Sequence, residues 1–305
     1  MGRKMKLLKT TITPTSSFAT LLKGDTLWGQ ICWAIRYRYG EARLEDLLVN
    51  YDKDPFLIAS DGFLSGFLPK PCLPLSFFGK NIDKKAIRKK IWLKADDFAE
   101  GKFQNALAGD EIESKIKQNA TMKNSINYAT FTTDADEFAP FALIETTLPP
   151  LDIYFLIDEN AFSQEELKAV MHDIGECGYG KKASIGKGRF KIDKFENLNT
   201  PASKIFMALS PFVLQGSDLA IKKCFYESFT RFGKHGGDLA SSSDVTKKPV
   251  LMAQTSALIA LEDKSNIQFI GKSIRGASTH KKSVQQGYAI LMPTKWSGNE
   301  LCKAL

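Results

Sequence analysis

Apolar and polar residues at the start of the chain follow the period of a strand and then that of a helix. Residues 6–13 are rich in Leu, Thr and Ile and end before Pro14, which predicts a strand. In residues 25–40 the apolar side chains recur at helical spacing. Asp25 stands where an N-cap is expected, and Gly40 stands where many helices end. A strand followed closely by a helix is therefore predicted.

The pattern continues with short strands, a second helix and a last strand. Residues 56–74 hold short apolar runs divided by the turn signal Asp61-Gly62, which predicts short strands. Residues 153–157 predict a buried strand, and residues 163–177 show helical spacing behind a capping box. Residues 189–193 alternate polar and apolar side chains, as a half-buried strand does. This order of elements is that of a ferredoxin-like βαββαβ unit.

Residues 81–140 interrupt this order with a lysine-rich run and then a polar stretch. We expect them to form a charged insertion that carries a long hairpin outside the core. The polar residues 197–203 mark the clearest linker, and several apolar runs of strand length follow them. The predicted fold class is therefore α+β, with an N-terminal ferredoxin-like domain over residues 1–196 and a smaller, strand-rich domain over residues 204–305.

The balance of charge suits a polyanionic partner. The 305 residues include 42 Lys and Arg against 34 Asp and Glu, so the net charge is +8 and the pI is about 9.1. Such an excess favours nucleic acid as a partner, although a soluble protein with a mildly basic surface has the same balance. Charge alone leaves both alternatives open.

Cysteine usage and the N-terminus indicate a reducing, cytoplasmic environment. The five cysteines are widely spaced and form no C-x-x-C pair, so neither a disulfide framework nor a zinc site is expected. The N-terminus lacks the apolar run of a signal peptide, and no apolar run approaches the length of a bilayer span. We therefore expect a cytoplasmic protein that is neither secreted nor embedded in a membrane.

A glycine-rich and basic stretch, GYGKKASIGKGR over residues 178–189, lies between the second helix and the last strand of the predicted unit. It matches the dinucleotide fingerprint G-x-G-x-x-A, but that fingerprint needs a strand before it and a helix after it. The order here is the reverse, so no cofactor is expected. Backbone amides near glycines, flanked by cations, suit a series of phosphates. Phosphate binding is favoured over the alternative, a helix C-cap followed by a loose loop.

A second basic segment with aromatic neighbours follows in the C-terminal half. Arg231, Phe232, Lys234 and His235 combine cations and rings that can meet phosphates and stack on bases. A glycine-rich turn joining two strands explains the same residues, and these two alternatives stay open. Elsewhere the chain shows no nucleophile with a base and no metal-ligand spacing. Binding is therefore favoured over catalysis, and no metal is expected.

Three parts of the chain together resemble the RAMP superfamily of CRISPR proteins. They are KGDTLWGQICWAI over residues 23–35, the glycine-rich loop over residues 178–188, and RFGKHGGDLA over residues 231–240 with VQQGYAILMP over residues 284–293. Within the superfamily, the chain resembles the subunits of type III-A effector complexes that cap the 5′ end of the crRNA. These parts span nearly the whole chain.

The resemblance implies two ferredoxin-like (RRM-type) domains in tandem and a subunit that is not an enzyme. It implies that the subunit binds the repeat-derived 5′ tag of the crRNA in antiviral defence. It also implies docking against the large polymerase/cyclase subunit and the adjacent backbone RAMP subunit. The RNA-binding residues predicted in this way and from the two basic segments are Gly178, Gly180, Lys181, Lys182, Ser184, Gly186, Lys187, Gly188, Arg189, Lys23, Lys123, Asn124, Arg231, Phe232, Lys234 and His235.

Two enzymatic alternatives are disfavoured by the sequence. A metal-independent RAMP endoribonuclease that processes precursor crRNA often uses a histidine as acid or base. No histidine occurs before His172, which weakens this alternative. A cytosolic nucleotide-binding enzyme is disfavoured by the reversed order of elements around the glycine-rich loop.

Overall fold

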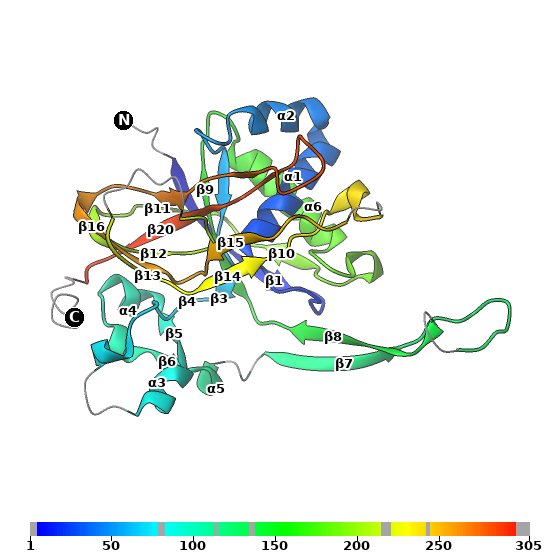
Figure 1. Ribbon diagram of the computed structural model, residues 1–305, viewed down its shortest axis with the longest axis horizontal. Coiled ribbons are helices and arrows are strands. Elements are labelled where there is room, and N and C mark those ends of the chain that lie inside the picture. The colour runs from blue at the N-terminus through cyan, green and yellow to red at the C-terminus, as the bar shows by residue number, and fades with distance from the viewer. Residues whose placement is uncertain are drawn as a thin grey trace.

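The computed structural model describes residues 5–78, 83–112, 114, 116–133, 138–214, 221–241 and 245–296. The protein is α+β and consists mostly of strands. Two antiparallel sheets form its body, and a small sheet and a long hairpin extend from it (Figure 1).

The first sheet joins strands from distant parts of the N-terminal half. Its strands are β1 (Lys6–Pro14), β2 (Leu57–Ala59), β9 (Leu151–Ile157) and β10 (Phe190–Ile192), with β3 (Phe63–Leu64) paired to β9 and β11 (Glu196–Leu198) paired to β1. The strand order is β10-β1-β9-β2, and each neighbouring pair is antiparallel. This places the fourth, first, third and second strands of the predicted βαββαβ unit side by side, so the predicted order of elements is confirmed here.

Three helices belong to the first unit: α1 (Gly24–Tyr39), α2 (Glu41–Val49) and α6 (Gln164–Cys177). The capping box predicted for α6 is present, because the Ser163 side chain accepts from the Glu166 amide and the Glu166 side chain accepts from the Ser163 amide. Gly40 ends α1 with a φ of 92°, as expected. The prediction of Asp25 as the N-cap of α1 is wrong, because Lys23 occupies that position and its side chain makes no capping bond.

Between β3 and β9, residues 67–147 form a small sheet, short helices and the predicted hairpin, so the insertion is longer at both ends than the predicted residues 81–140. Its elements are β4 (Phe67–Pro69), η1 (Leu75–Phe78), α3 (Lys84–Lys89), β5 (Lys90–Lys94), α4 (Ala95–Ala99), η2 (Phe103–Asn105), β6 (Leu107–Ala108), α5 (Gly109–Ile112), β7 (Lys117–Lys123) and β8 (Phe141–Thr147). Strands β7 and β8 form the hairpin that extends from the body (Figure 1). The expectation that the whole insertion lies outside the core is wrong, because Leu93, Phe98 and Phe103 are buried.

The second sheet repeats the strand order of the first. Its strands are β12 (Ser203–Ala208), β13 (Ile221–Phe225), β16 (Leu258–Ser265), β17 (Phe269–Gly271) and β20 (Tyr288–Thr294), in the order β13-β16-β12-β20-β17. This half also holds two two-stranded sheets, β14 (Ser228–Arg231) with β15 (Val250–Ala253) and β18 (Ile274–Arg275) with β19 (Val284–Gln285), and the 3-10 helix η6 (Gly237–Ser241). The 3-10 helix η5 (Ala183–Ile185) lies in the first half, between α6 and β10. After Cys177 the described residues contain no α-helix, so the second half is built from strands and a 3-10 helix.

One continuous core joins the two sheets. Buried Leu209, Leu258 and Ile290 of the second half belong to the same apolar cluster as buried Leu22 and Ile58 of the first. The predicted linker is reduced to residues 199–202, between the end of β11 and the start of β12. The two units are therefore packed against each other through apolar contact, and the connection between them is short.

The cysteines in the described part of the chain, Cys32, Cys72, Cys177 and Cys224, are all free thiols. Among the described helices, none has the length and apolar character needed to cross a membrane.

Candidate nucleic-acid interface

The glycine-rich loop joins α6 to β10 in a compact, left-handed path. Gly178, Gly180, Gly186 and Gly188 have positive φ angles of 97°, 76°, 84° and 75°, and Lys182 has a φ of 65°. A Cβ atom at Gly188 would lie 2.2 Å from the Tyr179 carbonyl oxygen, and one at Gly178 would lie 2.3 Å from the Lys187 carbonyl oxygen. The two ends of the loop thus touch through their backbones, which only glycine permits at these positions.

Helix α1 and the segment before it hold the loop in this shape. The Gln30 side chain donates to the Gly178 carbonyl oxygen at 2.8 Å and accepts from the Gly180 amide at 3.0 Å. The Thr20 hydroxyl accepts from the Lys181 amide at 3.0 Å. The loop is therefore fixed before any ligand arrives, which excludes the alternative of a loose loop.

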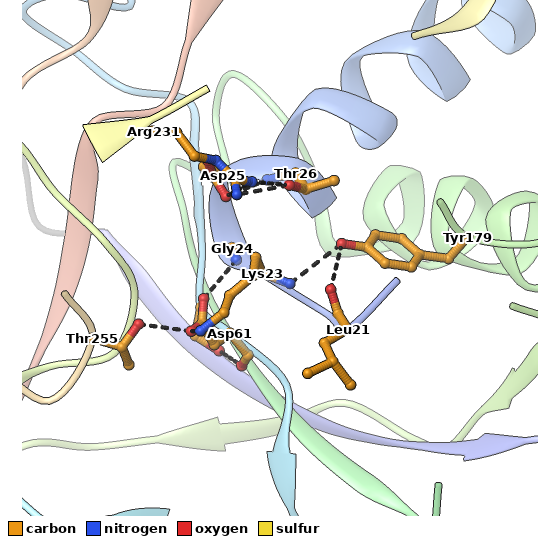
Figure 2. A network of polar contacts seen from close by, with 10 residues as sticks. Leu21, Lys23, Gly24, Asp25, Thr26, Asp61, Tyr179, Arg231 and Thr255 are labelled. Atoms are coloured by element: carbon orange, nitrogen blue, oxygen red, sulfur yellow. Dashed lines mark hydrogen bonds and ion pairs between the residues drawn. The ribbon is translucent and has the colours of Figure 1, made fainter. Parts of the chain in front are cut away.

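Tyr179 anchors the start of the loop in the core. Its side chain is fully buried, and its hydroxyl donates to the Leu21 carbonyl oxygen and accepts from the Lys23 amide, both at 3.3 Å (Figure 2). Burial raises the pKa of Tyr179, so the phenol stays neutral. Sequence patterns did not identify Tyr179, Gln30 or Thr20, since each acts through a distant partner.

The backbone amides open to a ligand are not those of the glycines. Residues 182–184 donate no backbone hydrogen bond to any part of the chain that the structure describes. Left-handed Lys182 followed by the right-handed turn of η5 directs three successive amides to one side, the arrangement called a nest, which binds anions. The glycine amides instead donate within the fold: Gly178 to Ile174, Gly180 to Gln30, Gly186 to Ala183 and Gly188 to Ser17.

Cationic side chains surround these amides. Lys181 and Arg189 are exposed, as is the Ser184 side chain. The Lys182 ammonium lies over the Phe141 ring of β8, 5.5 Å from its centroid. Lys123 of β7 is the cross-strand neighbour of Phe141, and Asn124 follows it, exposed, at the end of the strand. The structure therefore brings Lys123 of the hairpin to the side of the glycine-rich loop.

Lys187 differs from the other cations of the loop. Its ammonium lies 2.6 Å from a Glu145 carboxylate oxygen and donates to the Ser17 hydroxyl at 3.1 Å. The hydrogen bonds from Lys187 and Ser17 lower the pKa of Glu145, so this carboxylate stays ionised. The prediction that Lys187 meets phosphate is not supported, because its charge already has a partner. Its contact fixes β8 of the hairpin against the loop.

The predicted role of Lys23 also changes, because its ammonium pairs with buried Asp61 at 2.8 Å. The other oxygen of Asp61 accepts from the Gly24 amide at 2.8 Å, which caps α1 from outside the helix (Figure 2). Thr255 of the second half donates to the same carboxylate at 2.7 Å. Burial raises the pKa of Asp61, and the charge of Lys23 opposes that rise. Asp61 therefore organises the start of α1, although its sequence context indicated only a turn.

Arg231 forms a second ion pair at the start of α1. Its guanidinium donates to the two Asp25 carboxylate oxygens at 2.6 and 3.0 Å and to the Thr26 hydroxyl at 2.5 Å (Figure 2). The Asp25 side chain is only 3% exposed, whereas that of Arg231 is 28% exposed. Arg231 thus forms an ion pair with a buried carboxylate of the same chain, and its predicted contact with RNA stays a prediction.

The other residues of the second basic segment differ in their exposure to solvent. Phe232 is 73% exposed and Lys234 is exposed, whereas His235 is buried. The Ser278 hydroxyl lies 3.0 Å from Nε2 of His235, and the His280 ring lies edge-on to the His235 ring with centroids 5.2 Å apart. Of the four predicted residues, Phe232 and Lys234 are exposed, Arg231 is partly exposed and His235 is buried. In the described residues, no group of three or more His, Cys, Asp or Glu side chains is arranged to hold a metal.

The comparisons with known proteins concern the whole chain. No protein-family model and no curated protein matches its sequence. Among solved structures, it is similar to a chain of the Csm3-Csm4 subcomplex in the type III-A CRISPR-Cas interference complex, with 17% identity and a TM-score of 0.59 over 96% of this chain and 100% of that chain. It is also similar to a chain of the Csm1-Csm4 cassette in complex with pppApA, with 16% identity and a TM-score of 0.56 over 95% and 98% of the two chains.

These similarities concern the fold. Csm4 is the component common to both complexes, and the match extends over almost the full length of this chain. The resemblance that the sequence motifs indicated is therefore confirmed at the level of the fold.

Proposed function

We propose that this chain, which shares its fold with a type III-A CRISPR-Cas subunit, is a non-catalytic RNA-binding subunit of such an effector complex and acts in the cytoplasm. In this proposal the glycine-rich loop holds the repeat-derived 5′ tag of the crRNA. The observation that carries the proposal is the nest of residues 182–184, held rigidly and flanked by exposed Lys181 and Arg189. We also propose that both halves are variants of one ferredoxin-like plan, the second without its helices.

The chemistry of the loop suits a sugar-phosphate chain. The nest supplies uncharged donors to one phosphate, and the cations beside it can meet the neighbouring phosphates along a strand. Gln30 and Tyr179 hold the loop in place, so binding does not have to order it, which reduces the entropic cost of association. A strand leaving the nest can continue past Lys123 on the hairpin or toward exposed Phe232 and Lys234, where a base can stack on the ring.

The proposed protein partners follow from the same likeness. Similar chains come from Csm1-Csm4 and Csm3-Csm4 complexes, which supports docking of this chain against a large polymerase/cyclase subunit and an adjacent backbone RAMP subunit. Co-purification from a native host and sequencing of the bound RNA tests this part, with a shared 5′ tag as the expected result.

Neutralising the two exposed cations of the loop should weaken RNA binding and its salt dependence. In the Lys181→Gln/Arg189→Gln variant, we expect the slope of log affinity against log salt to fall by about 0.7 for each phosphate that no longer meets a cation. Fluorescence anisotropy with a labelled RNA that carries the 5′ tag measures both quantities. The matched control is Lys53→Gln/Lys168→Gln, which removes two exposed cations elsewhere. Equal slopes in the two variants would exclude the loop as the RNA site.

A metal-independent endoribonuclease is the second candidate, because the structure brings His235 and His280 together beside Ser278. Cleavage of RNA without metal needs an acid and a base, and two histidines supply both. His235 is only 8% exposed, which disfavours this candidate. Incubation with repeat RNA in the presence of a chelator should leave the RNA intact. A single defined cut that His280→Gln abolishes and His172→Gln retains would instead establish the endoribonuclease.

A further inference from the structure

A second concentration of positive charge lies on the insertion. Between residues 83 and 94 the chain carries six cations and one acid, Asp83; the cations are Lys84, Lys85, Arg88, Lys89, Lys90 and Lys94. Five of the six are exposed and Lys90 is half-buried. Helix α3 and strand β5 hold all six, so we call this surface the α3–β5 patch.

None of these six cations forms an ion pair with a carboxylate of the described residues. Elsewhere many cations do, among them Lys6 with Glu159, Arg38 with Asp173 and Lys295 with Glu100. Two acids, Asp96 and Asp97, follow the patch in α4, yet they make no salt bridge with it. The positive charge of the α3–β5 patch is therefore not neutralised within this part of the protein.

The patch is part of the fold and not a loose tail. The Asp83 side chain caps α3 by accepting from the Lys85 and Ala86 amides. Lys70 ties the helix to the small sheet, because its ammonium donates to the Ile87 carbonyl oxygen and its amide donates to the Ile91 carbonyl oxygen, at 2.9 and 2.8 Å. The cations therefore project from a fixed surface.

The arrangement of charge costs helix stability. Lys84 and Arg88 are four residues apart, as are Lys85 and Lys89, so like charges are neighbours on α3. Each such pair destabilises a helix by roughly 0.2–0.5 kcal/mol. On β5, Lys94 follows half-buried Trp92 at the spacing of residues that share one face of a strand. A polyanion that bridges these cations would relieve the repulsion.

We infer that the α3–β5 patch is a second nucleic-acid contact, which binds the phosphates of single-stranded RNA without reading its sequence. A strand of phosphates matches a row of cations along a helix and a strand better than a single small anion does. An anionic membrane is disfavoured as the partner, because membrane binding needs exposed apolar side chains as well as cations. Between residues 83 and 94, Ile91 is the one large apolar side chain that is exposed, at 41%.

The patch is separate from the glycine-rich loop. In Figure 1, α3 and β5 lie on the far side of the body from α6, which leads into that loop. A strand of RNA held at the loop does not need to reach the patch, so a guide-strand extension or a second RNA can occupy it. The inference therefore does not depend on the function proposed for the loop.

The test removes the charge of α3 and measures RNA binding. In Lys84→Gln/Lys85→Gln/Arg88→Gln/Lys89→Gln, affinity for a fluorescein-labelled single-stranded polyuridylate should fall, and the salt slope should decrease by about 0.7 for each phosphate that is no longer neutralised. The melting temperature should not fall, because the change removes like-charge repulsion. The same change is made in the Lys181→Gln/Arg189→Gln background, where the further decrease should persist if the two sites are independent.

A matched variant controls for net charge. It replaces four exposed cations scattered over the molecule and without ion pairs to described residues: Lys53, Lys168, Lys222 and Lys281. Its slope should stay closer to that of the wild type than the slope of the patch variant does. Equal slopes in the two variants would overturn the inference. Loss of binding to phosphatidylserine vesicles with unchanged RNA binding would also overturn it, and would assign the patch to a membrane surface.

Discussion

Replacing Arg231 with methionine should lower the free energy of unfolding by about 3 kcal/mol, because it removes the guanidinium that pairs with the buried carboxylate of Asp25. The Asp25 side chain is only 3% exposed, so water cannot replace the two hydrogen bonds that the guanidinium donates. Arg231 joins β14 to the first turn of α1, so its removal should also loosen the packing between the two halves. Denaturation in urea, followed by circular dichroism, measures the change.

A substitution of the other partner of the ion pair is the control for this prediction. Asp25→Asn keeps an oxygen acceptor and leaves the charge on Arg231, whose side chain is 28% exposed and can be solvated. The expected decrease in stability is about 1 kcal/mol, the size of one weakened hydrogen bond. The double variant should resemble Asp25→Asn more than Arg231→Met, because no unpaired charge remains. Equal decreases in the two single variants would show that the burial of Asp25 does not decide the energetics.

The same ion pair explains one limit of prediction from sequence. Local patterns located α1 correctly from its apolar spacing and from Gly40, and they located α6 from its capping box, because these signals lie within the element. The role of Asp25 was misassigned, since its partner Arg231 is 206 residues away in the chain. A carboxylate in a first helical turn has the same local signature whether it caps the helix or pairs across the core.

The candidate site shows the same division between local and distant information. The helix–loop–strand order around the glycine-rich loop was readable from the sequence and excluded a dinucleotide site. The sequence did not show which predicted cations are available, because Lys187 of the loop pairs with Glu145 on the hairpin and Lys23 before α1 pairs with Asp61. Leu93 and Phe103 are buried, but the lysines and polar residues around them in the sequence give no helical or strand pattern of apolar positions. Their part of the insertion was therefore assigned to the surface.

Replacing Gly188 with alanine should disrupt the glycine-rich loop and abolish tight RNA binding. The added Cβ would lie 2.2 Å from the Tyr179 carbonyl oxygen, and the φ of 75° disfavours any side chain. The left-handed backbone costs roughly 1–2 kcal/mol and the overlap adds a similar amount, so a decrease in stability of about 3 kcal/mol is expected. Chemical denaturation gives the stability, and anisotropy with tagged RNA gives the affinity.

Gly186→Ala separates the overlap from the backbone strain. Gly186 has a similar φ of 84°, but a Cβ there would meet no atom within 4 Å. This control should lose about 1 kcal/mol of stability and keep most of its RNA affinity. If Gly188→Ala remains folded yet no longer binds RNA, the nest of residues 182–184 must depend on the close approach of the two ends of the loop. If both variants bind as the wild type does, positive charge alone accounts for the affinity, and the proposed role of the nest is wrong.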